Sequence, residues 1–416
     1  MLQEIQCPVC GGRDFSELLN LGLSPAANNL IDNKEESVKA ERFKLDLIFC
    51  NKCGYARLSE IVDPEKLFTN YTYLTSVSKE TVSHFEEFSA SVIKKLRQTT
   101  NRRFKIIDIG SNDGTLLKFF KIKNFEILGV EPSKNVSEMA NRNGIPTINA
   151  FFTLNLANKI RNEFGLVDAI TMANVLTHVE NPKEMLSNAK SLLANKGIIV
   201  AEFYYFPKLM ENLAFDQIYH EHISYFTLRN FVEMLQSIGL DAFDVELTGA
   251  QGGSLRVWIS KKGERVIRTS VGKFLSNEGE TDNIINKYYH FSRNVYKLRD
   301  EIVHFVKNQR AQGKTVAGYA ASAKATTMIN FCGLDSSSIL FIADANPLKQ
   351  EKYIPGTDIK VVSPNMINLL KPSIIIIFAW NLVREIISYL TDNLDYKPSV
   401  YVFIPNLREI QLGDKK

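Results

Sequence analysis

Two pairs of cysteines near the N-terminus constrain this chain more than any other feature. The first pair is Cys7-Pro-Val-Cys10 and the second is Cys50-Asn-Lys-Cys53. Two such knuckles can supply the four thiolates of a tetrahedral zinc site. Four thiolates leave no open position on the metal for a substrate, so we predict one structural Zn²⁺ ion. A redox role for the pairs is the alternative, but neither pair lies in the βαβ context of a thioredoxin-like CxxC motif.

A glycine-rich segment further along the chain reads Asp108-Ile-Gly-Ser-Asn-Asp-Gly114. It lies between a predicted strand over Lys105–Ile109 and a predicted helix over Leu116–Phe120, which is the context that a ligand-binding loop requires. Gly110 and Gly114 would let the main chain approach a ligand, and plain turn chemistry is the alternative reason for them. The spacing lacks the third glycine of a dinucleotide loop, and the acidic Asp108 disfavours a pyrophosphate but favours a positively charged methionine moiety. We therefore predict S-adenosylmethionine rather than NAD as the cofactor.

Polar side chains at the ends of the next predicted strands support this choice. Glu131 ends the strand Glu126–Val130, where its carboxylate could accept both ribose hydroxyls, although a solvated strand-end carboxylate is the alternative. Asp168 and Asn174 bracket the strand Val167–Met172. The cofactor contacts that we predict are Asp108, Gly110, Asn112, Gly114, Glu131 and Asn174.

Strands and helices alternate along the rest of the chain, whose 416 residues are enough for two or three domains. The pattern predicts an α/β protein with a zinc-binding domain over residues 1–75, a doubly wound domain over 76–265 and a second α/β domain over 266–416. Two late strands, Asp241–Leu247 and Ser254–Ile259, would form an antiparallel edge of the central sheet.

Charge and hydropathy narrow the choice of partners and compartment. The formal net charge is +4 and no run of lysine and arginine is present, so nucleic acid is not expected as a partner. The longest apolar run, from Ile374 to Trp380, is too short for a membrane span of about 20 residues and is typical of a buried strand. The N-terminus lacks the pattern of a signal peptide, and most cysteines are in CxxC pairs. We therefore expect a cytoplasmic protein without membrane contact.

Three of the six histidines follow predicted strands, where open α/β sheets place their ligands. His178 follows the fourth strand of the central domain, and His220 and His222 belong to Tyr219-His-Glu-His222. A histidine beside a carboxylate is typical of a general base, and a hydrogen-bonded structural histidine is the alternative. An extended segment would place neighbouring side chains on two faces and a turn would bring them together, and both arrangements stay open. The remaining histidines lie on polar helical stretches and are expected to be surface or core residues: His84, His290 and His304.

Taken together, these motifs resemble the sugar C-methyltransferases, which act on nucleotide-linked 4-keto-deoxysugars. The matching segments are the four cysteines, Ile109-Gly-Ser-Asn-Asp-Gly-Thr-Leu-Leu117, Tyr219-His-Glu-His222 and Gly318-Tyr-Ala-Ala-Ser-Ala-Lys324, in the order of the family. The resemblance spans essentially the whole chain. It implies an N-terminal zinc-binding domain, a central S-adenosylmethionine methyltransferase domain and a C-terminal Rossmann-like domain that helps to hold the nucleotide sugar.

The resemblance also implies roles for individual residues. The catalytic residues that it implies are Tyr73, His178, Tyr219, Glu221 and His222. His222 would remove the proton at C-3 of a 4-keto-6-deoxysugar, with Glu221 orienting its imidazole. His178 or Tyr219 would donate a hydrogen bond to the enolate oxygen. Tyr71 competes with Tyr73 for its position, and no role is carried onto His220.

In the C-terminal half, the segment Gly318–Lys324 again follows a predicted strand and begins a helix. Main-chain amides at a helix N-terminus suit phosphate and Lys324 adds charge, so we predict the diphosphate of a dTDP- or GDP-linked 4-keto-deoxysugar here. A tight turn packed on small residues is the alternative. The substrate contacts that we predict are Ser322, Lys324, Asp344 and Asn346.

Two other functions stay open on the sequence alone. One is a small-molecule O- or N-methyltransferase, which would need no base for a C–H proton. The other is a zinc-ribbon module that binds nucleic acid, against which the modest charge counts. For the oligomeric state we expect a monomer or a weak dimer.

Overall fold

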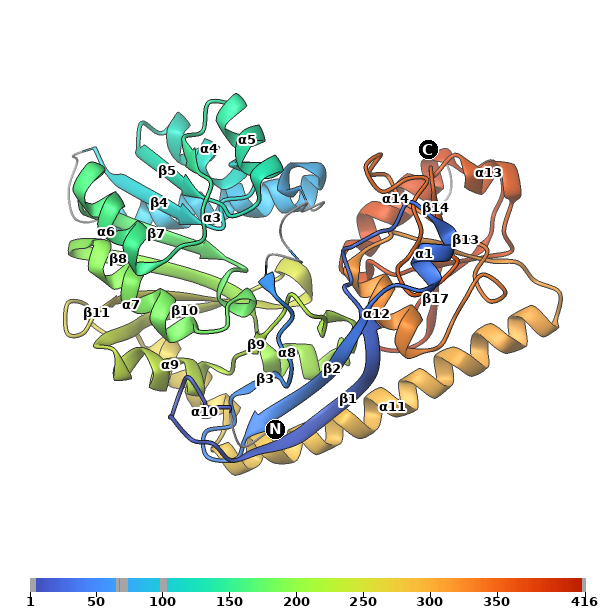
Figure 1. Cartoon of the computed structure of the whole chain (residues 1–416), viewed down its shortest axis with the longest axis horizontal. Helices are drawn as coiled ribbons and strands as arrows, with labels where there is room; N and C mark the ends of the chain where they lie inside the picture. The colour runs from blue at the N-terminus through green and yellow to red at the C-terminus, as the bar shows by residue number, and fades with distance from the viewer. Residues whose placement is uncertain (1–4, 65–66, 68–73, 98–102, 414–416) are drawn as a thin grey trace.

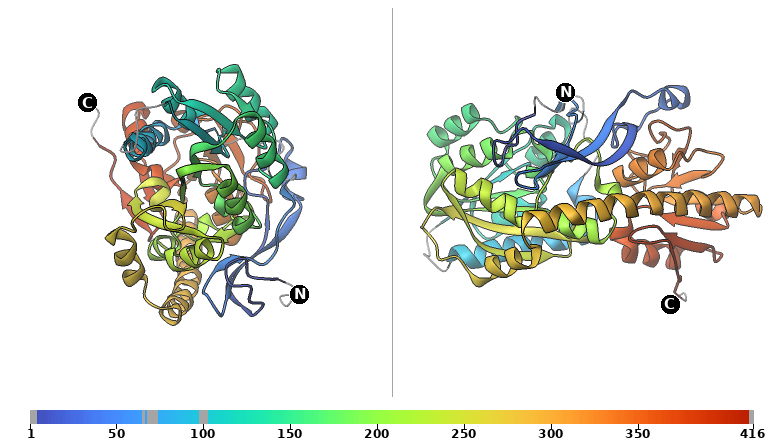
Figure 2. Two further views of the ribbon diagram at one scale, coloured as in Figure 1. Left: turned by 90° about the vertical axis from the view of Figure 1, so that its left-hand side faces the viewer. Right: turned by 90° about the horizontal axis from the view of Figure 1, so that it is seen from below.

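The computed structural model describes residues 5–64, 67, 74–97 and 103–413, which form three β-sheets (Figure 1). The central sheet lies in one lobe and the C-terminal sheet lies in the other. The N-terminal hairpin and the long helix α11 (Thr281–Ala311) run along both lobes, as the two turned views also show (Figure 2). A helix of 31 residues is about 46 Å long, which is enough to join the lobes along one side.

The N-terminal sheet has four antiparallel strands in the order β1-β2-β3-β9. Their bounds are β1 (Phe15–Pro25), β2 (Arg42–Cys50), β3 (Ala56–Leu58) and β9 (Ser224–Tyr225). Strand β9 comes from the middle of the chain, and the Tyr55 and Ser224 hydroxyls lie 2.5 Å apart where it joins the sheet. Because β9 follows Tyr219–His222 directly, this sheet holds one end of the histidine segment.

The connection between β1 and β2 forms an arm that lies on the C-terminal lobe. The arm includes helix α1 (Lys34–Val38), whose Ser37 hydroxyl donates to the carbonyl of Ile354 at 2.9 Å. Ile31 pairs with Tyr353 in an isolated antiparallel bridge. The N-terminal region is therefore in contact with both lobes.

The central sheet has seven strands in the order β10-β11-β8-β7-β4-β5-β6, with β11 and β10 forming an antiparallel edge. Their bounds are β4 (Lys105–Ile109), β5 (Glu126–Val130), β6 (Thr147–Ile148), β7 (Val167–Ala173), β8 (Leu193–Tyr204), β10 (Leu240–Thr248) and β11 (Ser254–Lys261). The predicted bounds of β4 and β5 and the predicted antiparallel edge are confirmed.

Helices cover both faces of the central sheet, which makes the domain doubly wound as predicted. Phe88 and Phe120 pack on one face, and Leu186 and Phe231 pack on the other. The helices are α3 (Lys79–Arg97), α4 (Thr115–Ile122), α5 (Lys134–Arg142), α6 (Leu154–Glu163), α7 (Pro182–Leu192), α9 (Leu228–Ser237) and α10 (Thr269–Glu278), while α8 (Phe206–Glu211) packs in a core shared with α11. Four short 3₁₀ turns lie in or beside this region: η2 (Thr75–Val77), η3 (Leu176–His178), η4 (Phe215–Gln217) and η5 (Ala250–Gly252).

The C-terminal sheet has the order β14-β13-β12-β15-β16-β17, and it is parallel except for β17. Its strands are β12 (Val316–Tyr319), β13 (Phe341–Ala343), β14 (Lys360–Val362), β15 (Ile374–Ile377), β16 (Ser399–Val402) and β17 (Arg408–Ile410). Its helices are α12 (Ala323–Phe331), α13 (Met366–Leu370) and α14 (Val383–Asn393), with the turn η6 (Trp380–Leu382) before α14. The apolar run that begins at Ile374 contains the buried strand β15, and the segment Gly318–Lys324 leads from β12 into α12, so both predictions are confirmed.

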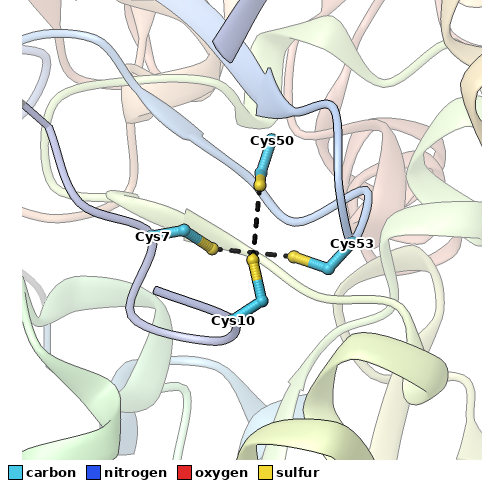
Figure 3. A group of neighbouring side chains, drawn as sticks. All are labelled: Cys7, Cys10, Cys50 and Cys53. Atoms are coloured by element: carbon cyan, nitrogen blue, oxygen red, sulfur yellow. Dashed lines mark hydrogen bonds between the residues drawn. The ribbon is translucent and has the colours of Figure 1, made fainter. Parts of the chain in front are cut away.

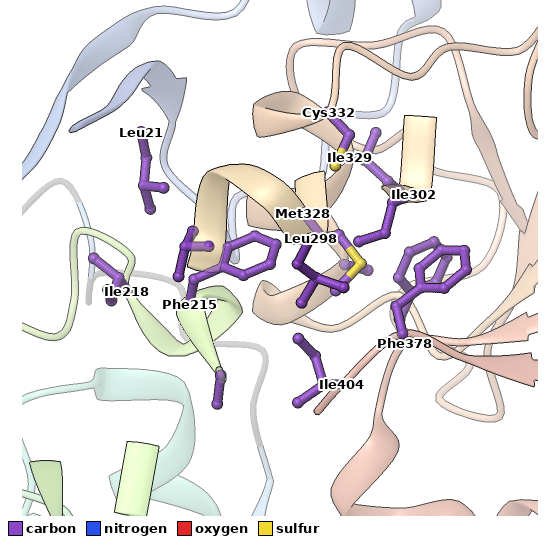
Figure 4. Close-up of a cluster of buried hydrophobic side chains, with 14 of the residues drawn as sticks. Leu21, Phe215, Ile218, Leu298, Ile302, Met328, Ile329, Cys332, Phe378 and Ile404 are labelled. Atoms are coloured by element: carbon purple, nitrogen blue, oxygen red, sulfur yellow. The ribbon is translucent and has the colours of Figure 1, made fainter. Parts of the chain in front are cut away.

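One apolar core joins the C-terminal lobe to elements from the rest of the chain. Leu298 and Ile302 of α11, Met328 of α12 and Phe378 pack together, and Phe215 of η4 reaches into the same cluster (Figure 4). The turn that precedes the histidine segment is therefore part of the C-terminal core. Separately, none of the helices in the described ranges has the length and apolar character needed to cross a membrane.

Candidate active site

The four cysteines predicted to bind zinc come together at one point. The sulfur atoms of Cys7, Cys10, Cys50 and Cys53 all lie within 4.8 Å of one another, and the side chains point inward from two turns (Figure 3). The Sγ atoms of Cys10 and Cys50 are 3.5 Å apart, close to the spacing of two ligands on one Zn²⁺. The donor set therefore fits a structural zinc ion.

The glycine-rich loop between β4 and α4 has the tight geometry that a ligand cradle requires. Gly110 has a φ of +71°, and a Cβ there would lie 2.5 Å from a methyl group of Val175. Gly114 has a φ of +80°, and a Cβ there would meet Ile145 at 2.9 Å. An L-residue at either position would combine an unfavourable backbone conformation with a clash, so turn strain and close packing both require glycine.

A cavity of about 430 Å³ opens beside this loop. Pockets of this size bind small molecules such as nucleoside cofactors. Five of the six predicted cofactor residues line it, together with His178: Asp108, Gly110, Asn112, Glu131 and Asn174. Gly114 shapes the loop from behind and is not among the lining residues.

Hydrogen bonds from the loop and its neighbouring segments hold two carboxyl groups in this cavity. The Glu131 carboxylate accepts the Asn112 N–H at 2.9 Å and the Ser133 N–H at 2.8 Å. Burial raises the pKa of Glu131, and these amides oppose that shift. Asp108 accepts the Thr171 hydroxyl at 2.6 Å, and burial raises its pKa to about 7. A cationic ligand would favour the ionised form of both groups.

The two residues that were expected to bracket the fourth strand differ in what they do. Asn174 lines the cavity with a φ of +57°, and its buried Oδ1 has no hydrogen-bond partner in the described chain, so it is available to a ligand. Asp168 instead accepts the Lys105 N–H at 2.9 Å, where strands β4 and β7 begin. That position is at the opposite end of the strands from the cofactor loop, so Asp168 does not support the choice of cofactor in the way that the sequence suggested.

The predicted catalytic histidines meet beside the cofactor cavity. The rings of His178 and His222 are edge to face with centroids 4.9 Å apart, and the Tyr219 ring lies 3.9 Å from that of His222. The segment Tyr219–His222 is a turn, in which the His222 N–H donates to the Tyr219 carbonyl at 2.8 Å. The turn resolves the choice that the sequence left open. Tyr73 and its competitor Tyr71 lie outside the described residues.

His222 is held in one tautomer by the main chain. Its Nδ1 lies 2.7 Å from the carbonyl oxygen of Gln217, so Nδ1 carries the proton and Nε2 keeps its lone pair. Burial lowers the pKa of His222 well below 6.5, and the neighbouring His178 and Lys324 lower it further. Burial also lowers the pKa of His178 to about 4. Both rings are therefore neutral at pH 7.

The prediction that Glu221 orients this imidazole is wrong, because the carbonyl of Gln217 does so. The Glu221 carboxylate accepts the side-chain amide of Asn28 at 3.0 Å. Neighbouring side chains leave a tight turn in different directions, so adjacency in sequence did not give contact. Burial raises the pKa of Glu221, and Asn28 opposes that shift. His220 packs edge-on against Phe43 with ring centroids 5.7 Å apart.

The four predicted substrate residues of the C-terminal lobe fall into two groups. Asp344 and Asn346 follow β13, where Asp344 accepts the Asn346 N–H at 2.8 Å and, from the turn after β12, the Ala321 N–H at 2.8 Å. Ser322 caps helix α12 by accepting the Ala325 N–H. Lys324 is buried in the first turn of that helix near Asp216, and burial lowers its pKa to about 8.

Several residues near the site were missed by the sequence analysis. Tyr204 lies at the end of β8 with its ring 5.4 Å from His222, and its position just beyond a predicted strand was a usable signal. His84 of α3 lines the cofactor cavity, and its Nε2 lies 2.5 Å from the buried carboxylate of Glu202. No local pattern distinguishes Asn28 or Gln217, because both act through contacts between distant segments.

Comparison with known proteins now adds to this geometry. Three family models match successive parts of the chain: a zinc-binding domain over residues 7–68, a methyltransferase domain over 82–245 and a C-methyltransferase C-terminal domain over 249–405. The C-methyltransferase NovU of Streptomyces niveus is 30% identical over 407 residues, which cover 97% of this chain and 96% of the relative. The chain belongs to the C-methyltransferase family.

Membership of this family confirms the predicted resemblance, the predicted fold class and the predicted cofactors. The protein is an S-adenosylmethionine-dependent C-methyltransferase with a zinc-binding domain. An O- or N-methyltransferase and a nucleic-acid-binding module are both set aside by this result.

Solved structures give a weaker likeness. The plantazolicin methyltransferase BpumL, in complex with a pentazolic analogue and SAH, is 15% identical with a TM-score of 0.37, over 44% of this chain and 85% of that one. Magnesium protoporphyrin IX methyltransferase (ChlM) from Synechocystis PCC 6803 with bound SAM is 16% identical with a TM-score of 0.33, over 44% of this chain and 81% of that one. Likeness at this level carries no conclusion about the present chain.

Proposed function

We propose that this C-methyltransferase methylates C-3 of a nucleotide-linked 4-keto-6-deoxysugar through an enolate. The observation that carries the proposal is a neutral, buried His222 whose tautomer is fixed by the Gln217 carbonyl. This ring lies next to His178, which lines the cofactor cavity. We place the reaction in the cytoplasm, in the biosynthesis of branched-chain deoxysugars.

Carbon becomes a nucleophile here only after a proton is lost. A 4-keto group acidifies the protons on the adjacent carbons, because the electron pair left behind is delocalised onto the carbonyl oxygen. The Nε2 lone pair of His222 would accept the C-3 proton, and the positive charge would then reside on its imidazole. The Gln217 carbonyl keeps the Nδ1 proton in place throughout.

The enolate oxygen needs a hydrogen-bond donor where its charge develops. Tyr219 and His178 flank His222 and are the side chains that we propose for this role. When bound, S-adenosylmethionine supplies an electrophilic methyl group to the enolate carbon. We propose that the loop residues Asp108, Gly110, Asn112, Glu131 and Asn174 hold it, with Gly114 shaping the loop.

The nucleotide would bind on the C-terminal lobe. Ser322, Asp344 and Asn346 surround the turn after β12, at the carboxyl ends of the parallel strands, where open α/β sheets bind their ligands. Lys324 is close enough to His222 to lower the pKa of that imidazole, so we assign it to the end of the substrate nearest His222. The zinc centre takes no part in the chemistry and stabilises the N-terminal sheet.

A panel of dTDP- and GDP-linked 4-keto-6-deoxysugars tests the proposal. We expect a gain of one methyl group on one sugar with S-adenosylmethionine present, and nuclear magnetic resonance should place it at C-3. Both C-3 and C-5 neighbour a C-4 ketone, so a methyl group at C-5 would contradict the assigned position and keep the enolate route. Transfer to no 4-keto sugar in the panel would contradict the proposed substrate class.

A further inference from the structure

The segment that carries His222 is attached to the C-terminal lobe by two side chains of η4. Phe215 is buried in the core of that lobe (Figure 4). Its ring centroid lies 5.3 Å from that of Phe331. The next residue, Asp216, is also completely buried, and its Oδ2 accepts the indole N–H of Trp380 at 2.9 Å. Trp380 belongs to η6, so a side chain of the C-terminal lobe bonds to the turn that precedes the base.

Trp380 is fixed in this position by its surroundings. Gly252 of η5 has a φ of +90°, and a Cβ there would lie 2.3 Å from a ring carbon of Trp380. The ring therefore packs directly on the main chain of Gly252, and no larger residue fits between them. The next residue of η6, Asn381, lines the cofactor cavity, so the same turn touches both the base segment and the cofactor site.

A single residue, Gln217, connects Asp216 to the imidazole of His222. Gln217 donates its N–H to the Ala214 carbonyl at 3.0 Å and its side-chain amide to the Gln251 carbonyl at 3.4 Å. Its own carbonyl accepts Nδ1–H of His222 at 2.7 Å. A turn of three residues has few free torsions, so anchoring the Asp216 side chain restricts the direction of the next carbonyl.

The charges around Asp216 make the Trp380 bond important. Among the described side chains, the indole is the hydrogen-bond donor to this carboxyl group, while Oδ1 has no partner. Burial raises the pKa of Asp216 to about 7, and the Lys324 ammonium, the indole and two main-chain amides oppose that shift. Lys324 attracts the carboxylate without forming an ion pair within 4.0 Å in the described part of the chain.

We propose that Trp380 is a positioning residue for the catalytic base: through Asp216 and the Gln217 carbonyl, the C-terminal lobe sets the tautomer and direction of the His222 imidazole. The base is then ready only when the two lobes are docked through η6. The role in catalysis rests on the proposed function, whereas the effect on the imidazole does not.

Trp380→Phe tests this inference, because phenylalanine keeps an aromatic ring against Gly252 and removes the N–H. The first measurement is the ¹⁵N resonances of the histidine side chains, with His222 assigned from a His222→Asn spectrum. We expect one Nδ1–H tautomer in the unmodified protein and a mixture of tautomers in Trp380→Phe. Ser37→Ala is the matched control, since it removes another buried hydrogen bond to the C-terminal lobe, and we expect the unmodified spectrum from it.

The second measurement is deuterium wash-in from D₂O into the 4-keto sugar. We expect a rate about 10-fold lower in Trp380→Phe, with KM for the sugar and the affinity for S-adenosylmethionine within about two-fold of the unmodified protein. An unchanged His222 tautomer and an unchanged rate in Trp380→Phe would overturn the inference, as would equal losses in Ser37→Ala.

Failure of the proposed function and failure of this inference give different results. If the unmodified protein exchanges no sugar, the proposed function fails, and the tautomer spectrum still decides the inference. If Trp380→Phe does not fold, Asp216→Leu removes the same bond from the other end and should give the same mixture of tautomers. Asp216→Asn keeps an acceptor oxygen and should disturb the tautomer less than Asp216→Leu, and the reverse order would contradict the inference.

Discussion

The cofactor loop and the histidine cluster lie next to each other, but different parts of the chain hold them in place. Gly110 and Glu131 directly follow two neighbouring strands of one sheet, and hydrogen bonds between and within the two adjacent turns fix them. His222 depends on the turn η4, on the N-terminal sheet through β9, and on the C-terminal lobe through Phe215 and Asp216. The cofactor site is thus a local structure, and the base site is a product of the whole assembled chain.

This difference predicts that a substitution far from the active site should disturb the position of the base more than the binding of the cofactor. The four thiolates join the ends of β1, β2 and β3, and structural zinc binding contributes on the order of 10 kcal/mol to the folding of small zinc domains. We expect Cys50→Ser to lose zinc, to unfold at a much lower temperature and to lose most methyl transfer. Metal analysis, thermal unfolding and activity measure these effects.

Cys332→Ala is the control for that variant, because Cys332 is a buried cysteine outside the cluster. It should keep one zinc ion and most activity. If any folded Cys50→Ser protein keeps full methyl transfer, the N-terminal sheet does not support the base, and the contrast between the two sites fails.

The reverse selectivity is expected from the cofactor loop. Alanine at Gly110 would require a positive φ, which costs about 1–2 kcal/mol, and would also clash with Val175. We expect Gly110→Ala to weaken S-adenosylmethionine binding by about 100-fold, measured by calorimetry, while the His222 tautomer stays unchanged. Gly263→Ala shares the positive φ but meets open space, so it should lose a little stability and no cofactor affinity.

Cofactor binding should also depend on pH through Asp108. Burial raises its pKa to about 7, so the free protein holds this carboxyl protonated at pH 6 and ionised at pH 8. A cationic methionine moiety favours the ionised form, so affinity should fall by about 10-fold from pH 8 to pH 6. Asp108→Asn cannot ionise and should show no such change, and a dependence that persists in this variant would belong to the ligand.

An effect of similar size is expected from the N-terminal arm. Asn28→Ala removes the hydrogen bond to Glu221 and leaves a buried carboxyl group without that donor, at a cost of about 1–3 kcal/mol. We expect kcat to fall by about 10-fold and the affinity for S-adenosylmethionine to stay the same. The exposed residue next to Asn28, Asn29, gives a matched control. An equal loss of kcat in Asn29→Ala would show that the Glu221 contact is unimportant.

The same difference explains what could be predicted from the sequence. Strands β4 and β5, the loop between β4 and α4, and the zinc ligands depend on local pattern, and each was found where the pattern indicated. The partner of His222 could not be found in this way, because it is a main-chain carbonyl group. Every residue has one, so the sequence gives no signal for it. Glu221 was assigned the orienting role on adjacency alone, and Asn28 approaches it from a distant part of the chain.

The central claim is that His222 removes a proton from the carbon that is methylated. The most direct test is deuterium wash-in from D₂O into a 4-keto-6-deoxysugar without S-adenosylmethionine, comparing the unmodified protein with His222→Asn. We predict exchange at C-3 that is slower by about 10²–10⁴-fold in the variant, with the affinity for S-adenosylmethionine unchanged. Exchange at the full rate in a folded His222→Asn protein would contradict the assignment of the base.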